Sequence, residues 1–157
     1  MTITYTNQQK LGNNFLRSLG DTMFATSASI TVYSGAQPTA VTVQGNWTSY
    51  KTSNVECLAH FLTGPSWSYN AGTLTWYNTT NPNATNVYNT GTASWAIIWS
   101  KTISTVLVQG STLPDTQFVV VPVSTATGTG ILRMVSADVV PGTTATVTSS
   151  GMTYVFA

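Results

Sequence analysis

About ten short runs of β-branched and aromatic residues, separated by turn residues, constrain the fold of this chain more than any other feature. Most runs alternate with a period of two, which is typical of strands. They lie at residues 30–34, 41–43, 55–62, 74–77, 93–100, 103–108, 117–123, 131–135, 144–148 and 152–156. No helical pattern separates them, and parallel strands need such crossovers. The sequence therefore predicts an all-β, antiparallel fold.

We expect these strands to form a two-sheet antiparallel sandwich, jelly-roll-like or immunoglobulin-like, with a distorted barrel as the alternative. Asn-Ala-Gly at 70–72 and Pro-Gly at 141–142 are among the turn signals that separate the strands. Pro122 interrupts an apolar run and cannot donate a ladder hydrogen bond. Its strand should therefore lie at a sheet edge or carry a bulge, which makes Pro122 a candidate contact residue between copies.

Before the first strand, apolar residues recur at helical spacing over residues 8–24. This pattern predicts one short N-terminal helix, with Leu16 and Leu19 as candidate interface residues. The length of 157 residues fits a single domain. We therefore expect residues 1–157 to form one domain, with an N-terminal arm and helix at 1–26 and the β-sandwich at 27–157.

Charge is scarce: the chain has five Lys or Arg, four Asp or Glu, one His and a formal net charge of +1. An ordinary soluble domain carries about a quarter of its residues charged. The cations are scattered, so the sequence predicts neither nucleic acid nor a membrane surface as a partner. Polarity comes instead from Thr, Ser and Asn. A surface of hydroxyls and amides suits a protein that packs against neighbours in an assembly.

Glu56, Cys57 and His60 are the one cluster of residue types suited to metal binding or nucleophilic catalysis. If residues 55–62 form a strand, Cys57 and His60 project to opposite faces. Glu56 and His60 then share a face but lie about 13 Å apart, at roughly 3.3 Å per residue. We therefore expect a buried thiol and a half-exposed strand histidine, with no metal site and no catalytic residue.

Other catalytic patterns are weak as well. The acids Asp21, Glu56, Asp115 and Asp138 are far apart in the sequence and offer few pairings for acid-base hydrolysis. The Gly-Thr-Gly at 128–130 precedes a strand, whereas a phosphate-binding loop opens a helix. The sequence predicts no cofactor.

Aromatic residues crowd into about a third of the chain, between residues 47 and 99. Trp95 and Trp99 fall on one face of a predicted strand, so we expect them in the core. The other candidates lie in polar or Gly-Pro-flanked segments, where loop exposure and an interface role are the alternatives to burial. These interface candidates are Trp47, Tyr50, Trp67 and Tyr69.

Two motifs resemble a family of small tailed-bacteriophage virion proteins. Residues 30–38 are Ile-Thr-Val-Tyr-Ser-Gly-Ala-Gln-Pro, similar to the strand that follows the N-terminal helix in that family. Residues 91–99 are Gly-Thr-Ala-Ser-Trp-Ala-Ile-Ile-Trp, similar to the family's Gly-Thr-Ala-x-Trp strand. The run Gly-Thr-Thr-Ala-Thr-Val-Thr at 142–148 follows the same order of strands and turns. The resemblance implies a virion location and carries over no catalytic residues.

The resemblance and the low charge predict a non-enzymatic virion structural protein that coats or cements the capsid. The expected partners are further copies of the chain and the major capsid protein or other virion proteins. The first ten residues lack a signal-peptide pattern, so we expect synthesis in the host bacterial cytoplasm. The alternative is a tail, neck or fibre component, structural or glycan-binding, with Trp67 and Tyr69 as a stacking platform. A hydrolase would need an acid pair or the Cys/His pair in a cleft.

Overall fold

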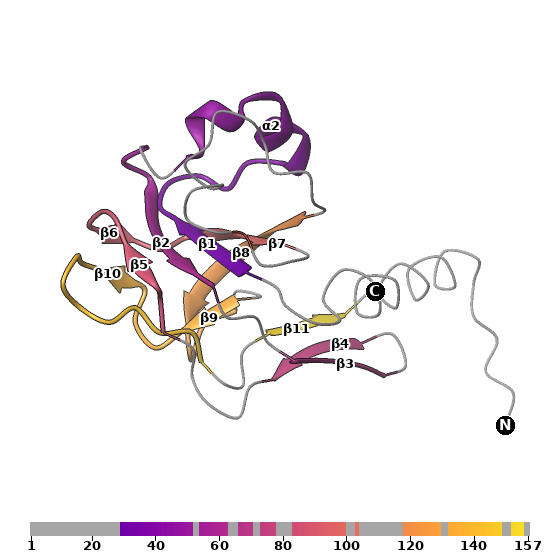
Figure 1. Ribbon diagram of the computed structural model, residues 1–157. Helices are drawn as coiled ribbons and strands as arrows, with labels where there is room; N and C mark the ends of the chain where they lie inside the picture. Colours follow the sequence, from indigo (N-terminus) through magenta and orange to yellow (C-terminus); the bar gives the residue numbers. More distant parts are fainter. Residues whose placement is uncertain are drawn as a thin grey trace, which may run out of the picture.

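The computed structural model describes residues 29–51, 54–62, 66–70, 73–77, 83–99, 103, 118–129, 132–148 and 152–155. Within these ranges the chain is mostly β-strand, with one short α-helix and one 3-10 turn (Figure 1). The predicted helix at 8–24, with Leu16 and Leu19, lies outside the described residues. The predicted strand at 103–108 also lies outside them, apart from Ile103.

The largest sheet has six strands and mixed direction. Their order is β5 (Asn86–Val87), β2 (Cys57–Phe61), β1 (Ser29–Tyr33), β7 (Trp95–Trp99), β8 (Phe118–Thr125) and β9 (Leu132–Met134). Neighbouring strands are antiparallel as predicted, except that β8 and β9 run parallel. That pairing is short, from Val123 with Leu132 to Thr125 with Met134. Only six residues, 126–131, separate the two strands, which is too few for the helical crossover that usually joins parallel strands.

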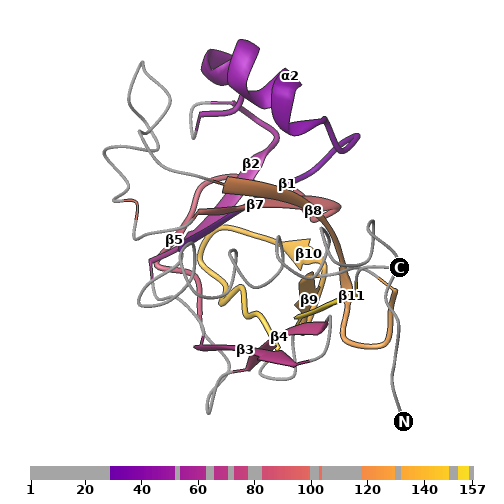
Figure 2. The same ribbon diagram turned by 90° about the vertical axis from the view of Figure 1, so that its right-hand side faces the viewer.

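This sheet curls until its two ends meet. Isolated bridges join Asn83 to Thr146, next to β5, and Met134 of β9 to Val147. On the same segment, the Ala84 N–H donates to the Ala145 carbonyl at 2.8 Å. Residues 145–148 thus lie between β9 and the residues that precede β5 (Figure 2). A regular strand was predicted at 144–148, but this segment forms isolated bridges instead. The bridges give the curled sheet a barrel-like closure, which reduces its exposed strand edges.

Two smaller sheets complete the described structure. One has the order β11 (Met152–Val155), β4 (Thr73–Tyr77) and β3 (Ser66–Asn70), and lies on the side of the curled sheet away from α2 (Figures 1 and 2). The other pairs β10 (Asp138–Val139) with β6 (Gly91–Thr92). β3 and β4 pair antiparallel from Ser66 with Tyr77 to Asn70 with Thr73, as expected for strands on either side of the predicted Asn-Ala-Gly turn.

β3 corrects the expectation of a loop after Gly64 and Pro65. Trp67 and Tyr69 belong to this strand, and Trp67 pairs with Trp76 of β4. The segment Ser-Trp-Ser-Tyr-Asn alternates small polar and aromatic residues, which is a strand pattern even though it contains no aliphatic residue.

α2 (Ala40–Gly45) replaces the strand predicted at 41–43. Thr39 is its N-cap, and the Thr39 side chain accepts a hydrogen bond from the Thr42 N–H at 3.1 Å. Only Val43 of this helix is buried, whereas Val41 is 77% exposed. The two valines therefore mark a helix with one buried position, not one face of a strand. A 3-10 turn, η2 (Trp47–Ser49), follows directly.

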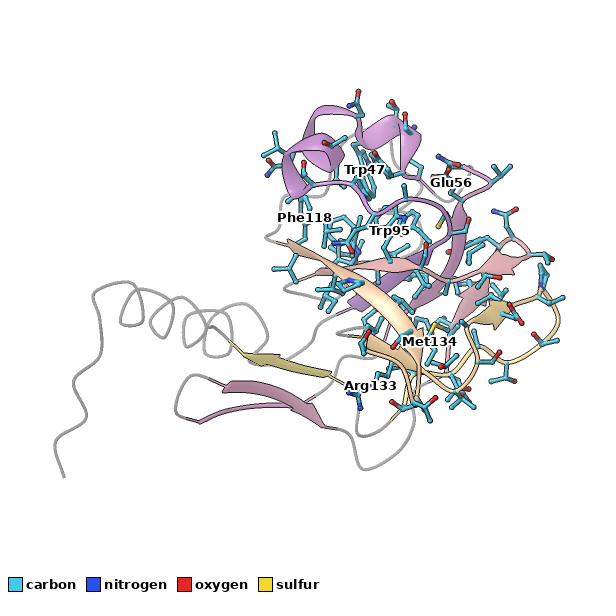
Figure 3. All side chains as sticks on the ribbon, turned by 180° about the vertical axis from the view of Figure 1, so that it is seen from behind. Trp47, Glu56, Trp95, Phe118, Arg133 and Met134 are labelled. Atoms are coloured by element: carbon cyan, nitrogen blue, oxygen red, sulfur yellow. The ribbon has the colours of Figure 1, made fainter. Side chains whose placement is uncertain are left out.

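β1, β2 and β7 are buried on both faces, and each face packs into its own cluster. The first cluster, here called the aliphatic core, lies inside the curl and consists of Ile30, Val32, Leu58, Ala59, Phe61, Ala93, Ala96, Ile98, Val121, Val123, Leu132, Met134, Val139, Ala145 and Val147. The second, the aromatic core, consists of Tyr33, Val43, Trp47, Cys57, Trp95, Ile97, Trp99 and Ile103. α2 and η2 cover the aromatic core. Figure 3 shows Trp47 and Trp95 on one side of the sheet and Met134 on the other.

Pro122 is half-buried in β8, opposite Trp95. The Val123 N–H donates to the Ser94 carbonyl at 2.8 Å, so the neighbouring Pro122 nitrogen faces away from β7. β9 pairs only with Val123–Thr125. β8 is therefore not an edge strand, but among the described residues its Phe118–Pro122 part is paired on the β7 side alone, as the missing donor of a proline requires.

Candidate functional site

The Cys57 and His60 pair does not have the geometry expected from a regular strand. In the pairing of β1 with β2, Val32 faces Ala59 and Tyr33 faces Cys57, so Leu58 has no partner. Such a bulge adds one residue and reverses the alternation of side chains along the strand. Cys57 and His60 consequently lie on the same face, the side of the aromatic core. The prediction of opposite faces was wrong.

His60 is fully buried, not half-exposed as predicted. Its Nε2 lies 2.7 Å from the Ile103 carbonyl oxygen, and its Nδ1 lies 2.9 Å from Thr31 Oγ1. A carbonyl can only accept, so Nε2 carries the ring proton and Nδ1 accepts from the Thr31 hydroxyl. Thr31 Oγ1 in turn accepts from Trp99 Nε1 at 3.0 Å. Both ring nitrogens are thus engaged in structural hydrogen bonds.

Burial shifts both titratable groups of the pair away from reactivity. Desolvation lowers the pKa of His60, and the hydrogen bond to Ile103 opposes this only in part, so the imidazole is neutral at pH 7. Burial raises the pKa of the Cys57 thiol to about 12, although Tyr33 acts in the opposite direction. A reactive cysteine needs an accessible thiolate. Cys57 is the buried thiol that the sequence predicts.

Within the described ranges, no three His, Cys, Asp or Glu side chains gather closely enough to hold a metal ion. The absence of catalysis and of a cofactor stays a prediction. The described part also contains no helix long and apolar enough to cross a membrane.

The aromatic core is built from ring contacts with defined geometry. Tyr33 stacks on Trp95, with centroids 4.2 Å apart and an interplanar angle of 7°. Trp47 meets Trp99 edge-on at 5.5 Å, and Tyr50 meets Trp95 edge-on at 5.7 Å. Trp95 and Trp99 of β7 are fully buried, which confirms their predicted core role. Stacked and edge-to-face pairs of this kind add about 0.5–1.5 kcal/mol each beyond their burial.

Trp47 corrects the expectation of loop exposure, because it is only 4% exposed. η2 turns it toward Trp99, and no periodic pattern in residues 45–50 signals this. Tyr50 is half-buried. The interface role predicted for these two residues stays a prediction, and for Trp47 it would require the side chain to leave the core.

The ring donors of Tyr33, Trp95 and Trp99 have hydrogen-bond partners. The Tyr33 hydroxyl donates to the Tyr50 carbonyl at 2.6 Å, and Trp95 Nε1 donates to the Ser34 carbonyl at 2.9 Å. Trp47 Nε1 and the Tyr88 hydroxyl are buried without a partner. Desolvation raises the pKa of Tyr33 well above 10 and that of Tyr88 to about 12. All these side chains are neutral at pH 7.

The two motifs at 30–38 and 91–99 lie side by side, because β1 pairs with β7 along its whole length. Ser94 joins them twice: its N–H donates to the Tyr33 carbonyl at 2.9 Å, and its hydroxyl donates to the Gly35 carbonyl at 2.5 Å. Gly35 has φ +83°, which favours glycine, and a Cβ at Gly91 would lie 2.9 Å from Leu58 Cδ2. The motif residues therefore have packing and turn roles, and they present no reactive group.

The part of the surface that the described residues form carries little charge. Threonine is the most frequent of the exposed described residues, and Asp138 is the one charged residue among them. Four valines add apolar area: Val41, Val55, Val135 and Val140. The other described charges, Lys51, Glu56 and Arg133, are half-buried.

Comparisons with protein-family models, with curated proteins and with solved structures found no match to this chain.

Proposed function

We propose that this chain is a non-enzymatic structural protein of a bacteriophage virion that coats or cements the capsid. The observation that carries the proposal is the exposed surface of the described residues, which is rich in threonine and has Asp138 as its one charged residue. The sandwich type, jelly-roll-like or immunoglobulin-like, belongs to the same proposal.

The physical argument concerns what a surface must lose when it is covered. A charge buried at an interface loses several kcal/mol of hydration unless it is well paired. Threonine offers a methyl group for contact and a hydroxyl that can donate or accept, so it loses less and adapts to a neighbour. A weak net charge also limits repulsion between identical copies packed side by side.

The resemblance at 30–38 and 91–99 supports the same assignment through its structural role. These residues form the central β1–β7 pair and the turn after β1, so their role is to build the fold. A virion protein needs a rigid scaffold with broad contact surfaces. The expected partners are other copies of this chain and the major capsid protein or other virion proteins.

The test is the copy number per virion. Quantitative mass spectrometry of purified particles of the phage that encodes the chain should find hundreds of copies. Six, twelve or a few dozen copies would instead place it in the neck or tail. Its absence from purified particles would overturn the virion assignment.

A second measurement addresses the nature of the contact. Raising salt from about 0.1 M to 1 M shortens the Debye length from roughly 10 Å to 3 Å. A protein held by apolar and hydrogen-bonded contacts should stay on the particles across this series. Release at moderate salt would mean that charges hold it, which contradicts the cementing role.

The alternative, a glycan-binding tail or fibre component, is favoured by one observation. Trp67 and Tyr69, the predicted stacking platform, are two residues apart in β3. Binding of the isolated protein to host cells or to a glycan array, lost in Trp67→Ala and Tyr69→Ala variants that still fold, would favour this alternative over the capsid role.

A further inference from the structure

His60 is the centre of a buried hydrogen-bond chain that joins three strands to a distant residue. Trp99 Nε1 of β7 donates to Thr31 Oγ1 of β1, and the Thr31 hydroxyl donates to His60 Nδ1 of β2. His60 Nε2 donates to the Ile103 carbonyl, and the Ile103 N–H donates to Ser29 Oγ at 3.0 Å. We call this hydrogen-bond network the His60 joint. His60 and Ile103 are 43 residues apart in sequence, so the joint is a long-range contact.

The hydrogen-bond arrangement of the joint accommodates a neutral imidazole but not a protonated one. Protonation would add a hydrogen to Nδ1, which points at Thr31 Oγ1. That oxygen already accepts from Trp99 Nε1, and the Thr31 hydroxyl hydrogen would then need another acceptor. The new charge would also sit at a position with no solvent exposure. Burying an unpaired charge is unfavourable by several kcal/mol.

No described neighbour supplies a compensating negative charge. On the same side of the sheet, β1 contributes Tyr33, β2 contributes Cys57, and Tyr88 follows β5; their raised pKa values keep all three neutral. Glu56 lies beside Gly35, with its Oε1 3.1 Å from the position of a Cβ there. β7 has no titratable residue, and Asn86 of β5 pairs with His60. Among the described residues, burial lowers the pKa of His60 and the hydrogen bond with the Ile103 carbonyl raises it in part.

We propose that the His60 joint is a proton-sensitive hydrogen-bond network. It holds Ile103 against β1 and β2 while His60 is neutral, and it opens when acid protonates His60. This inference is independent of the proposed virion role.

The direction of the pH dependence follows from linkage. Burial lowers the pKa of His60 in the fold below 6.5, its value in an unfolded chain. The unfolded or opened state therefore binds a proton first as the pH falls. Stability from this site is fully present above pH 6.5 and declines below it, until the pH reaches the pKa of the folded state. A single proton changes the unfolding equilibrium by at most about tenfold per pH unit.

The chain has one histidine, which makes the test direct. In the wild-type protein, the imidazole NMR signals should report the Nε2–H tautomer and should not shift between pH 8 and pH 6. Chemical denaturation should show the unfolding equilibrium constant rising by up to tenfold per pH unit between pH 6.5 and 5.5. Ordinary carboxyl groups titrate near pH 4 and contribute little in this window.

Amide hydrogen exchange locates the opening. Protection of the Ile103 amide, corrected for intrinsic exchange, should fall between pH 7 and 5.5. The Val123 amide, bonded to the Ser94 carbonyl, is the internal control and should keep more of its protection. Equal loss of protection at both amides would show that the His60 joint does not open locally, and would overturn the proposal.

His60→Gln supplies the matched variant, because its amide can donate and accept but cannot titrate. Its stability should be flat between pH 7.5 and 5.5. If this variant does not fold, the wild-type measurements decide alone. An imidazole that titrates near pH 6.5 in the folded protein, or a wild-type stability that is flat from pH 7.5 to 5.5, would overturn the proposal.

Discussion

The two faces of the curled sheet are buried to a similar degree but are specified in different ways. The aliphatic core inside the curl contains Val, Ile, Leu, Ala, Met and a single Phe, and presents no side-chain hydrogen-bonding group. The aromatic core on the other face contains two strand tryptophans and Tyr33, and hydrogen bonds orient all three rings. Packing volume alone specifies the aliphatic core, whereas the direction of hydrogen bonds also specifies the aromatic core.

This difference sets how each face should respond to change. Aliphatic side chains can be exchanged if the total volume is kept, because nothing but packing selects them. In the aromatic core, removing the donor of Tyr33, Trp95 or Trp99 leaves its partner group without that hydrogen bond. The aromatic face should therefore be the less tolerant one, and the following variants test that contrast.

The largest loss is expected for Trp99→Ala. Trp99 is fully buried, contacts Trp47 and Phe118, and donates to Thr31 of the His60 joint. Truncation should lower the free energy of unfolding by about 3–5 kcal/mol, measured by chemical denaturation. On the aliphatic face of the same strand, Ile98→Val should lower it by only about 0.5–1.5 kcal/mol. Equal losses would remove the contrast between the faces.

Gly91→Ala should be the next most damaging change, and it acts on the aliphatic core. A Cβ at Gly91 would lie 2.9 Å from Leu58 Cδ2, so the buried Leu58 side chain must move. Overpacking of this kind lowers stability by about 1–3 kcal/mol. The double variant Gly91→Ala with Leu58→Ala should show strong coupling, because the second change removes the clash. Additive losses in the double-mutant cycle would contradict this explanation.

The regular strands, which contribute residues to both faces, were the easiest part to predict. Alternation in residues 30–34 and 93–100 identified β1 and β7, and the spacing of Trp95 and Trp99 identified them as core residues. These signals are local, since each strand carries its own period of two.

The parts of the aromatic face that the sequence did not predict depend on irregular backbone or long-range contact. The bulge at Leu58 places Cys57 and His60 on one face, and no residue pattern marks a bulge there. Trp47 reaches the core through a 3-10 turn without periodicity. Ile103 binds His60 across 43 residues, which no spacing rule anticipates. The strand predicted at 41–43 is instead α2, which Thr39 caps.

Tyr33→Phe tests one directional contact of the aromatic core at nearly constant volume. The phenyl ring keeps the stacking position against Trp95, but the Tyr50 carbonyl loses its donor. We expect a loss of about 1–2 kcal/mol in the free energy of unfolding, since a partly buried acceptor is left unsatisfied. The matched control is Phe61→Leu in the aliphatic core, which removes no hydrogen bond. A Tyr33→Phe variant as stable as the wild type would mean that water replaces the lost donor.

The smallest effect within the aromatic core is expected for Trp47→Phe. Trp47 Nε1 is buried without a partner, so its removal breaks no hydrogen bond and relieves a desolvated donor. The lost ring volume works against this gain, and the two together should change stability by less than about 1 kcal/mol. Trp95→Phe removes a similar volume but also the bond from Nε1 to the Ser34 carbonyl, so it should be worse by about 1 kcal/mol or more. Thermal and chemical unfolding of the two variants measure this difference directly. If they lose equal stability, volume alone controls the aromatic face, and the distinction between the two faces of the sheet fails.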